Sequence, residues 1–240
     1  MSIAGKVAIV TGGSRGIGRA IAAALLSRGT HVVIAGMDEA SLEATAAELQ
    51  AAAPTSSRVV PYRTDVRRAD AVQALMDKAA ERLGGVDILV NNAGIRGFAP
   101  VADMSPDDWE AVVATNLTGA FQCCRAVLPH LRRRGGGWII NISSLSSQSP
   151  FAGGAAYCAS KAGLNAFSDA LMQEVRHEGI RVSTVLPGSV NTRFGGHDGK
   201  AEWKLAPEDV AAAVVDLLAH PARSLPSRVE LRPSCPPRKG

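Results

Sequence analysis

Val7-Ala8-Ile9-Val10 is a short apolar run, and Thr11-Gly12-Gly13-Ser14-Arg15-Gly16-Ile17-Gly18 follows it directly. The run has the length of a buried strand, and the glycines permit a tight turn into a helix that begins near Ile17. In such a turn, backbone N–H groups and the positive end of the helix can face a phosphate group. A tight strand-to-helix connection without a ligand is the alternative interpretation.

Outward from this turn, short apolar runs alternate with longer amphipathic stretches along the whole chain. This alternation is typical of a parallel sheet with helices on both faces. We therefore expect an α/β protein with a single doubly wound parallel sheet of about seven strands, and one domain over residues 1–240. The predicted strands are 6–10, 31–36, 58–63, 86–91, 138–142, 181–186 and 229–231.

The composition fits a chain with a large core, since 46% of the 240 residues are hydrophobic. No uninterrupted apolar run approaches the roughly 20 residues of a membrane span. The N-terminus enters a strand at once, without the pattern of a secretory signal, so we expect no membrane association and a cytoplasmic protein. The four cysteines show no CxxC spacing, which argues against a metal site and against a disulfide framework.

The basic residues are concentrated at the C-terminal end. Residues 221–240 contain five Lys or Arg and one Glu, a net +4, which equals the formal charge of the whole chain. The other 220 residues are therefore balanced. A basic tail rich in proline is a poor match for a nucleic-acid-binding surface, which needs basic side chains along one face with aromatics between them. We expect no nucleic-acid partner, and we keep such binding through the tail as the weakest alternative.

Polar residues follow the predicted strands where ligands bind to this class of sheet, at the carboxyl ends. Asp65-Val66 ends one strand, Asn91-Asn92-Ala93-Gly94 ends the next, and Asn116 lies in the long helix after it. Each has a structural alternative as a helix cap, a turn residue or a partner for a kinked backbone.

Three reactive side chains lie farther along the chain. Tyr157 and Lys161 are four residues apart and share one helix face, and Ser144 stands just past the strand 138–142. A tyrosine has an ordinary pKa of ~10, and a nearby cation should lower it. From position alone, the neighbouring Ser143, Ser146 and Ser147 remain candidates beside Ser144.

Taken together, these motifs resemble the short-chain dehydrogenase/reductase family over about residues 3 to 220. The general appearance is similar to 3-oxoacyl-(acyl-carrier-protein) reductases and related carbonyl reductases. The resemblance implies hydride transfer between a nicotinamide cofactor and a small carbonyl or secondary alcohol, possibly a 3-oxoacyl thioester. It also assigns roles, with Tyr157 as proton donor, Ser144 as ligand of the substrate oxygen, Asn116 as ligand of a water, and Lys161 as ligand of the nicotinamide ribose.

The resemblance further implies a cofactor-binding set spread along the chain and no metal. After the strand 181–186, the Pro-Gly turn and the residues that follow it would hold the nicotinamide end. The full set is Gly12, Ser14, Arg15, Gly16, Ile17, Gly18, Asp65, Val66, Asn92, Ala93, Gly94, Tyr157, Lys161, Pro187, Gly188, Val190 and Thr192.

The end of the second strand bears on the choice of cofactor. Gly36 stands where an acid would select NAD(H), and Met37 stands where many NADP-dependent relatives have an arginine. Arg15, inside the glycine-rich turn, could reach a 2'-phosphate. We therefore predict NADP(H) in preference to NAD(H), with an NAD(H)-dependent alcohol dehydrogenase as the alternative.

Two segments depart from the family pattern. The segment 191–205, expected to cover the substrate, is short, and the Pro-rich tail 221–240 is unlike the usual C-terminal strand and tail. The family still implies a homo-oligomer, a tetramer or a dimer, built on the helices near 106–133 and 157–178. A catalytically silent, cofactor-binding regulator is the alternative of another class, although such a protein would not need Asn116, Ser144, Tyr157 and Lys161 together.

Overall fold

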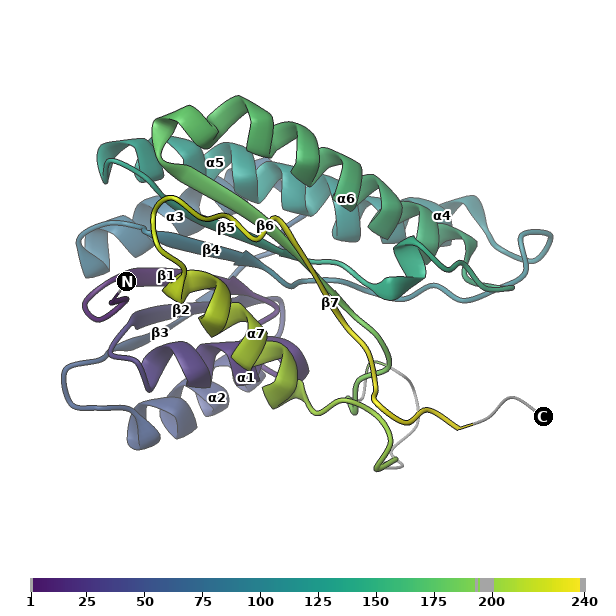
Figure 1. The fold of residues 1–240 in the computed structure, drawn as a ribbon, viewed down its shortest axis with the longest axis horizontal. Helices are drawn as coiled ribbons and strands as arrows, with labels where there is room; N and C mark the ends of the chain where they lie inside the picture. Colours follow the sequence, from purple (N-terminus) through teal and green to yellow (C-terminus); the bar gives the residue numbers. More distant parts are fainter. Residues whose placement is uncertain (1, 193, 195–200, 238–240) are drawn as a thin grey trace.

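The computed structural model describes residues 2–192, 194 and 201–237, and its seven strands form one parallel sheet in the order β3-β2-β1-β4-β5-β6-β7 (Figure 1). The predicted α/β class and strand number are confirmed, and each strand begins and ends within two residues of its expected position. The strands are β1 Val7–Thr11, β2 His31–Gly36, β3 Val59–Arg63, β4 Ile88–Asn91, β5 Gly137–Ile142, β6 Ile180–Pro187 and β7 Arg228–Leu231.

Helices cover both faces of the sheet (Figure 1). On one face lie α1 Gly16–Leu26, α2 Glu39–Ala52 and α7 Pro207–Ala219. The other face carries α3 Ala69–Leu83, α5 Gly119–Arg133 and α6 Ala155–Val175, with α4 Pro106–Val113 leading into α5. The strand order reverses between β1 and β4, so the crevice expected of a doubly wound sheet lies beyond the carboxyl ends of these two strands.

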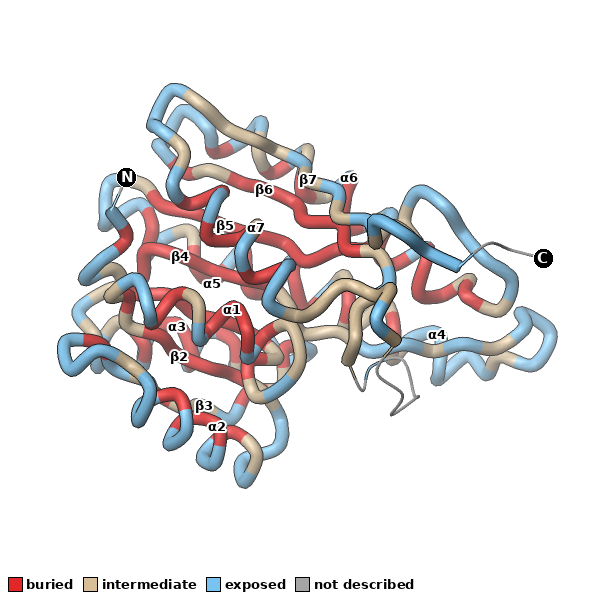
Figure 2. The backbone as a smooth tube through the Cα atoms, turned by 60° about the horizontal axis from the view of Figure 1, so that its bottom comes forward, coloured by how far each residue is buried: buried red, intermediate tan, exposed pale blue. Residues whose placement is uncertain are grey.

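The sheet separates two apolar cores. All five residues of β1 are buried, and they alternate: Ala8 and Val10 face the α1 and α7 side, whereas Ile9 faces the α3 and α5 side. Figure 2 shows the same pattern, with the central strands buried and the outward faces of the helices exposed. Burial on both faces explains why the central strands are continuous apolar runs.

The helices α4 and α5 are continuous through a π-helical turn, Ala114–Thr118. Ser105 caps this helix, because its hydroxyl accepts a hydrogen bond from the Asp108 amide (3.1 Å). By length and composition alone, the stretch Pro106–Arg133 could cross a membrane, which the inspection of uninterrupted runs did not predict. Its Val127 and Leu131 side chains are fully buried in the core between the sheet and the helices α3, α5 and α6.

The C-terminal segment runs beside the carboxyl end of β6. The Gly188 amide donates to the Leu231 carbonyl (2.8 Å), so the Pro-Gly turn after β6 is tied to the end of β7.

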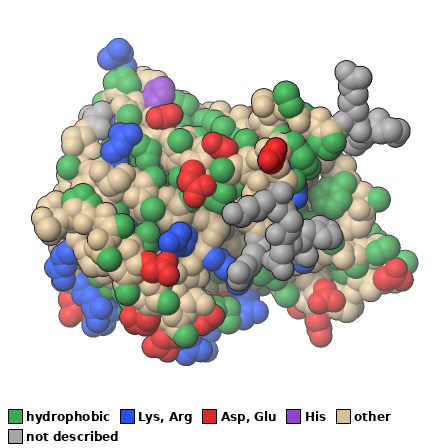
Figure 3. All heavy atoms as spheres, turned by 90° about the horizontal axis from the view of Figure 1, so that it is seen from below, with side chains coloured by type: hydrophobic (Ala, Val, Ile, Leu, Met, Phe, Trp, Pro, Cys, Tyr) green, Lys and Arg blue, Asp and Glu red, His purple; other side chains and the backbone are tan. Residues whose placement is uncertain are grey.

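Figure 3 views the face covered by α1, α2 and α7, where acidic and basic side chains are interspersed.

Candidate active site

The glycine-rich turn packs directly against the end of β4. Gly12 has a φ of +64°, and the Asn92 side-chain amide donates to the Thr11 carbonyl (3.0 Å) and to the Gly12 carbonyl (3.1 Å). The Thr11 hydroxyl accepts from the Asn92 amide (3.0 Å) and the Ala93 amide (3.1 Å). A Cβ at Gly18 would lie 2.5 Å from Asn92 Nδ2 and closer still to the Gly12 carbonyl, so the turn has no room for a side chain there.

The start of α1 fits a diphosphate group. Gly16 has a φ of +53°, and Arg15 at the cap position makes no side-chain hydrogen bond to the helix, so the first N–H groups are not capped by a side chain. A helix N-terminus of this kind binds anions. A Cβ at Gly16 would lie 3.3 Å from Thr192 Cγ2, which places the segment after the Pro-Gly turn directly over this cradle.

Asn116 lies in the π-helical turn and is almost fully buried. Its side chain accepts from the Ile95 amide (2.8 Å) and donates to the Ile95 carbonyl (2.8 Å) and to the Ser160 hydroxyl (3.1 Å). A Cβ at Gly94 would lie 3.3 Å from Asn116 Oδ1 and 3.7 Å from Lys161 Nζ. The π-helical turn, the end of β4 and α6 therefore meet at this residue.

Lys161 is buried on α6, and its ammonium group donates to the Ile142 carbonyl at the end of β5 (2.8 Å). Burial penalises the charged form and lowers the pKa of Lys161 to about 8. The same nitrogen lies 5.9 Å from the centre of the Tyr157 ring. The predicted sharing of one helix face by these two residues is thus realised.

Tyr157 is buried, and the Ser144 side chain lies close enough to influence its phenol. Burial raises the pKa of Tyr157, while the influence of the Ser144 hydroxyl lowers it. Burial therefore outweighs the lowering expected from Lys161, whose ammonium group donates to the Ile142 carbonyl. Ser144 also accepts from the Ser146 amide (3.1 Å), so it caps the short 3₁₀ turn Leu145–Ser147.

The neighbouring serines are less well placed. The Ser143 hydroxyl donates to the Lys161 carbonyl (3.3 Å), and the Ser147 hydroxyl donates to the Ser144 carbonyl (2.6 Å). Among the candidates left open by the sequence, Ser144 is the one whose side chain influences the pKa of Tyr157.

At the end of β3, Asp65 is bound by its own neighbour. The Arg67 guanidinium donates to both carboxylate oxygens of Asp65 (2.9 and 2.7 Å) and holds the pKa of that carboxyl below its usual range. Val66 is buried and packs on α5, since a Cβ at Gly119 would lie 2.8 Å from its side chain. Asp65 and Val66 thus lie at the carboxyl edge of the sheet, as expected, but the Asp65 carboxylate is paired with Arg67.

A basic residue that sequence reasoning missed, Arg63 at the end of β3, lies beside the end of β2. Arg63 pairs with Gly36 across the two strands, and its side chain donates to the Met37 carbonyl (3.3 Å). Asp38 is used as the cap of α2, where it accepts from the Ser41 amide (3.2 Å) and hydroxyl (2.6 Å). The hydrogen bonds from Ser41 lower the pKa of Asp38, and the positive charge of Arg15 adds a smaller effect in the same direction. Only the strand pairing could have revealed Arg63.

The segment 191–205 is closed at its base. Val190 and Leu205 form a parallel bridge, and the Asn191 side chain donates to the Ala201 carbonyl (2.9 Å) and accepts from the Ala201 amide (3.2 Å). Phe194 lies 6.0 Å from Tyr157 between ring centres, whereas Trp203 lies beside Lys204. The glycine-rich part, 195–199, and the end of the basic tail lie outside the described residues.

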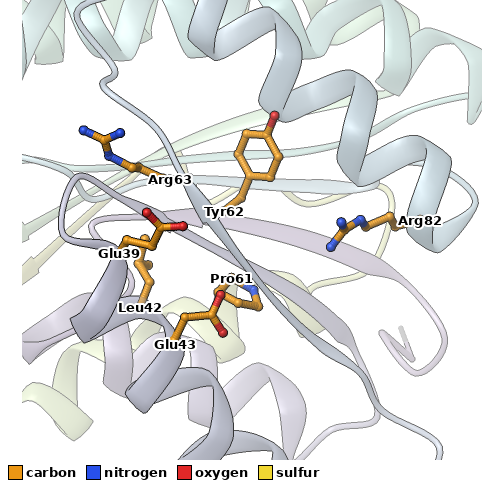
Figure 4. Close-up of a pocket in the computed structure, with 7 residues that line it drawn as sticks. All are labelled: Glu39, Leu42, Glu43, Pro61, Tyr62, Arg63 and Arg82. Atoms are coloured by element: carbon orange, nitrogen blue, oxygen red, sulfur yellow. The ribbon is translucent and has the colours of Figure 1, made fainter.

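A cavity of about 470 Å³ lies at the edge strand β3 (Figure 4). Residues of α2 and β3 line it, with Arg63 and Arg82 at opposite ends in this view. It contains none of Asn116, Ser144, Tyr157 and Lys161.

The cysteines offer no alternative chemistry among the residues that the structure describes. Burial raises the pKa of the Cys123 thiol to about 12 and that of Cys124 further, so neither is a ready nucleophile. Cys158 is also buried, and Cys235 is exposed. Within the same described ranges, no cluster of three or more His, Cys, Asp or Glu side chains could hold a metal ion.

Comparisons with known proteins agree with this geometry. The model of the short chain dehydrogenase family matches residues 6–203. An uncharacterised oxidoreductase from Staphylococcus saprophyticus is 36% identical over 230 residues, which cover 95% of this chain and 97% of the relative. A D-threitol dehydrogenase from Mycolicibacterium smegmatis is 37% identical over 230 residues, which cover 91% of this chain and 87% of the relative.

Solved structures are similar along almost the whole chain. An alcohol dehydrogenase from the archaeon Thermococcus sibiricus, complexed with 5-hydroxy-NADP, has a TM-score of 0.89 and 32% identity, with 98% of this chain and 99% of that chain covered. A metagenomic short-chain oxidoreductase in complex with NADP has a TM-score of 0.86 and 37% identity, with 98% and 100% covered.

Proposed function

This chain belongs to the short-chain dehydrogenase family of oxidoreductases, which act on alcohol and carbonyl groups, and we propose that it transfers a hydride between NADP(H) and a ketone or secondary alcohol. One observation carries the proposal: buried Tyr157 lies near the Ser144 side chain and beside the ammonium group of Lys161, next to a cradle suited to a diphosphate.

Reduction of a ketone requires a hydride at carbon and a proton at oxygen. The reduced nicotinamide, when bound, supplies the hydride. In this proposal Tyr157 donates its phenolic proton to the substrate oxygen, and the Ser144 hydroxyl donates a second hydrogen bond to the same oxygen. Ser144 thereby orients the carbonyl and stabilises the negative charge that develops on it.

Lys161 stabilises the phenolate that remains after proton donation. Because its pKa is about 8, it can also exchange protons near neutral pH. A water bound by Asn116, as the family resemblance implies, would follow Lys161 in this proton path. The amide of Asn116 is engaged by Ile95 and Ser160, so its second role is to hold the loop after β4 against α6.

The cofactor would lie along the carboxyl edge of the sheet. Its diphosphate would contact the turn from Gly12 to Gly18, and its nicotinamide end would lie between Gly94 and Thr192. The hydrogen bonds and the bridge described above support this edge at Asn92, Ala93, Gly188 and Val190. Pro187, the last residue of β6, lies at the same edge. Asp65 would contribute to the adenine side only together with Arg67, which binds its carboxylate.

The preference for NADP(H) over NAD(H) is supported by the positive charge at the end of β2. Gly36 provides no acid, and Arg63 approaches this position from β3. The positive charge of Arg15, in the glycine-rich turn, acts on Asp38 just after it. A 2'-phosphate carries the negative charge that such guanidinium groups bind. Two solved relatives hold NADP or an NADP derivative, which is consistent with this preference.

The substrate assay separates the alternatives. NADPH and NADH oxidation are measured with simple ketones, a four-carbon ketose and a 3-oxoacyl thioester, and alcohol oxidation is measured with NADP⁺ and NAD⁺. The ketose tests the chemistry suggested by the threitol dehydrogenase relative, and the thioester tests an acyl-carrier substrate. A lower KM for NADH than for NADPH would refute the cofactor assignment.

Two variants test the catalytic roles. Tyr157→Phe should reduce kcat about 10²- to 10⁴-fold, the usual contribution of a positioned proton donor. Tyr62→Phe is the matched control, because Tyr62 is the only other tyrosine and lies at the edge of the sheet. Equally slow cofactor oxidation by wild type and Tyr157→Phe on every substrate would favour the silent regulator.

A homo-oligomer is the remaining part of the proposal, with α5 and α6 as its interface. Phe121 on α5 is exposed and contacts Phe167 on α6 (6.1 Å between ring centres), and Trp109 on α4 is also exposed. Exposed aromatic residues are typical of protein interfaces. Light scattering should give a dimer or tetramer, and Phe121→Arg should reduce the assembly to smaller species.

A further inference from the structure

Three phenylalanine side chains from separate segments gather around Tyr157. Phe98 comes from the loop after β4 and lies 5.6 Å from Tyr157 between ring centres. Phe194, from the segment after β6, lies 6.0 Å from it. Phe151, just before α6, lies 5.2 Å from Phe98 in an edge-to-face contact at 88°. The rings thus form an aromatic wall, defined here as Phe98, Phe151 and Phe194.

Neighbouring glycines position one side of the aromatic wall. A Cβ at Gly154 would lie 2.6 to 3.0 Å from carbons of the Phe151 ring, so this ring packs closely over the start of α6. A Cβ at Gly153 would lie 3.8 Å from the Ala99 backbone, which brings the loop of Phe98 beside the loop of Phe151. Because the two rings also contact each other, their positions are set by packing between loops.

The aromatic wall remains open to solvent despite these contacts. Phe98 is 48% exposed, Phe151 is 43% exposed and Phe194 is 42% exposed, whereas Tyr157 between them is only 9% exposed. Exposed aromatic side chains grouped at one place cost free energy unless a ligand or partner covers them. Their position beside the phenol that would meet the substrate oxygen favours a ligand.

We propose that the aromatic wall binds a flat apolar substituent of the substrate, so that the preferred substrates are aryl or aryl-alkyl ketones and the corresponding secondary alcohols. This inference rests on the proposed function, since it places the carbonyl at Tyr157. A phenyl group next to the carbonyl can contact the rings edge-to-face or in an offset stack. A polyhydroxylated chain would instead place hydroxyl groups against apolar rings, where they lose hydrogen bonds to water.

A matched series of methyl ketones tests the preference. Acetophenone, cyclohexyl methyl ketone, 2-butanone and a four-carbon ketose are compared by kcat/KM with NADPH and with NADH. Covering a phenyl group should raise kcat/KM for acetophenone over that for 2-butanone by roughly 30-fold or more. Cyclohexyl methyl ketone has an apolar ring of similar size that is not flat. Comparing it with acetophenone shows whether the wall prefers an aromatic ring or any apolar group. Equal or greater kcat/KM for the ketose would overturn the proposal.

Variants of the wall give a second, independent test. Phe98→Leu and Phe151→Leu should each lower the ratio of kcat/KM for acetophenone to that for 2-butanone by about 10-fold, since each removes an aromatic contact. Tyr62→Leu is the control, because it also removes an aromatic ring but lies on the edge strand β3. An unchanged ratio in both wall variants would overturn the proposal.

Calorimetric binding of 1-phenylethanol distinguishes this inference from the proposed function. If no ketone is reduced but the alcohol binds wild type and binds Phe98→Leu about 10-fold more weakly, the proposed function fails and the aromatic site stands. If simple ketones are reduced but 1-phenylethanol binds wild type and Phe98→Leu equally, the function stands and the aromatic site fails.

Discussion

The side chain of Asn116 makes both hydrogen bonds that the backbone of Ile95 offers, accepting from its amide and donating to its carbonyl, each at 2.8 Å. This pair ties the loop after β4 to the π-helical turn, and the bond from Asn116 to Ser160 continues the connection to α6. The loop that carries Gly94 and Phe98 is thereby held at a fixed distance from Tyr157 and Lys161.

Asn116→Ala should therefore affect both stability and activity. Loss of the amide leaves the Ile95 groups without their partner and should lower the free energy of unfolding by about 1–3 kcal/mol. We also expect a lower kcat, because the loop is no longer positioned. Urea unfolding and steady-state kinetics measure the two effects. Gln122→Ala is the control, since it removes a single exposed bond to the Arg67 carbonyl and should have little effect on either.

The buried ammonium group of Lys161 predicts a pH-dependent stability. Its pKa is about 8 in the folded chain and ordinarily 10.5, so below pH 8 the folded state bears the full cost of a buried charge. As the pH rises from about 8 to 10.5, the folded chain releases this proton first and the cost is relieved. Wild type should therefore gain about 3 kcal/mol relative to Lys161→Met over this range.

Urea unfolding of wild type and Lys161→Met at pH 7 and at pH 10.5 measures this difference, and other titrating groups cancel between the two proteins. A constant difference between them at both pH values would show that Lys161 titrates normally.

The packing of the glycine-rich turn predicts an unequal response to two similar substitutions. Gly18→Ala places a methyl group against the Gly12 carbonyl and the Asn92 amide, and should cost about 1–3 kcal/mol of stability and weaken cofactor binding. Gly36→Ala is the matched control, because its methyl group would meet Leu42 only at 3.7 Å, an ordinary contact. Thermal unfolding of the two variants should rank them in this order, and equal losses would contradict the described packing.

Arg15 and Arg63 should select for the 2'-phosphate. Arg15→Ala and Arg63→Ala are each expected to raise the KM for NADPH about 10-fold and the KM for NADH less than twofold, the effect of losing one charge-assisted hydrogen bond. Arg82→Ala, at the other end of the cavity of Figure 4, should change neither. Calorimetry with a 2'-phosphorylated ADP-ribose and with ADP-ribose gives the same comparison without turnover. Parallel changes for both cofactors would refute the assignment.

The sheet could be predicted from the sequence because strands buried on both faces are apolar throughout, as Val7 to Val10 and Ile88 to Val90 show. The glycine-rich turn could be predicted because its backbone leaves no room for a side chain at Gly18, so the turn requires glycine there and is visible in the sequence. These features depend on local sequence alone.

The remaining features depend on contacts between distant segments. The π-helical turn at Asn116 is stabilised by Ile95, and Arg63 reaches Met37 only because β3 pairs with β2. The direction of the Tyr157 pKa depends on the balance between burial and neighbouring charge, and the spacing of Tyr157 and Lys161 specifies only their proximity. The aromatic wall combines three segments of the chain and has no sequence motif.

The bridge between Val190 and Leu205 has a consequence for how substrate preference can change. The two ends of the intervening segment are held together by the two hydrogen bonds between Asn191 and Ala201 and by the bridge itself. The entropy of closing a loop increases only slowly with its length. Segments of other lengths and compositions could therefore be inserted between Thr192 and Ala201 while the sheet and Thr192 are kept. Replacing the segment above this base is thus a way in which evolution or protein engineering can change the substrate specificity of the same catalytic framework.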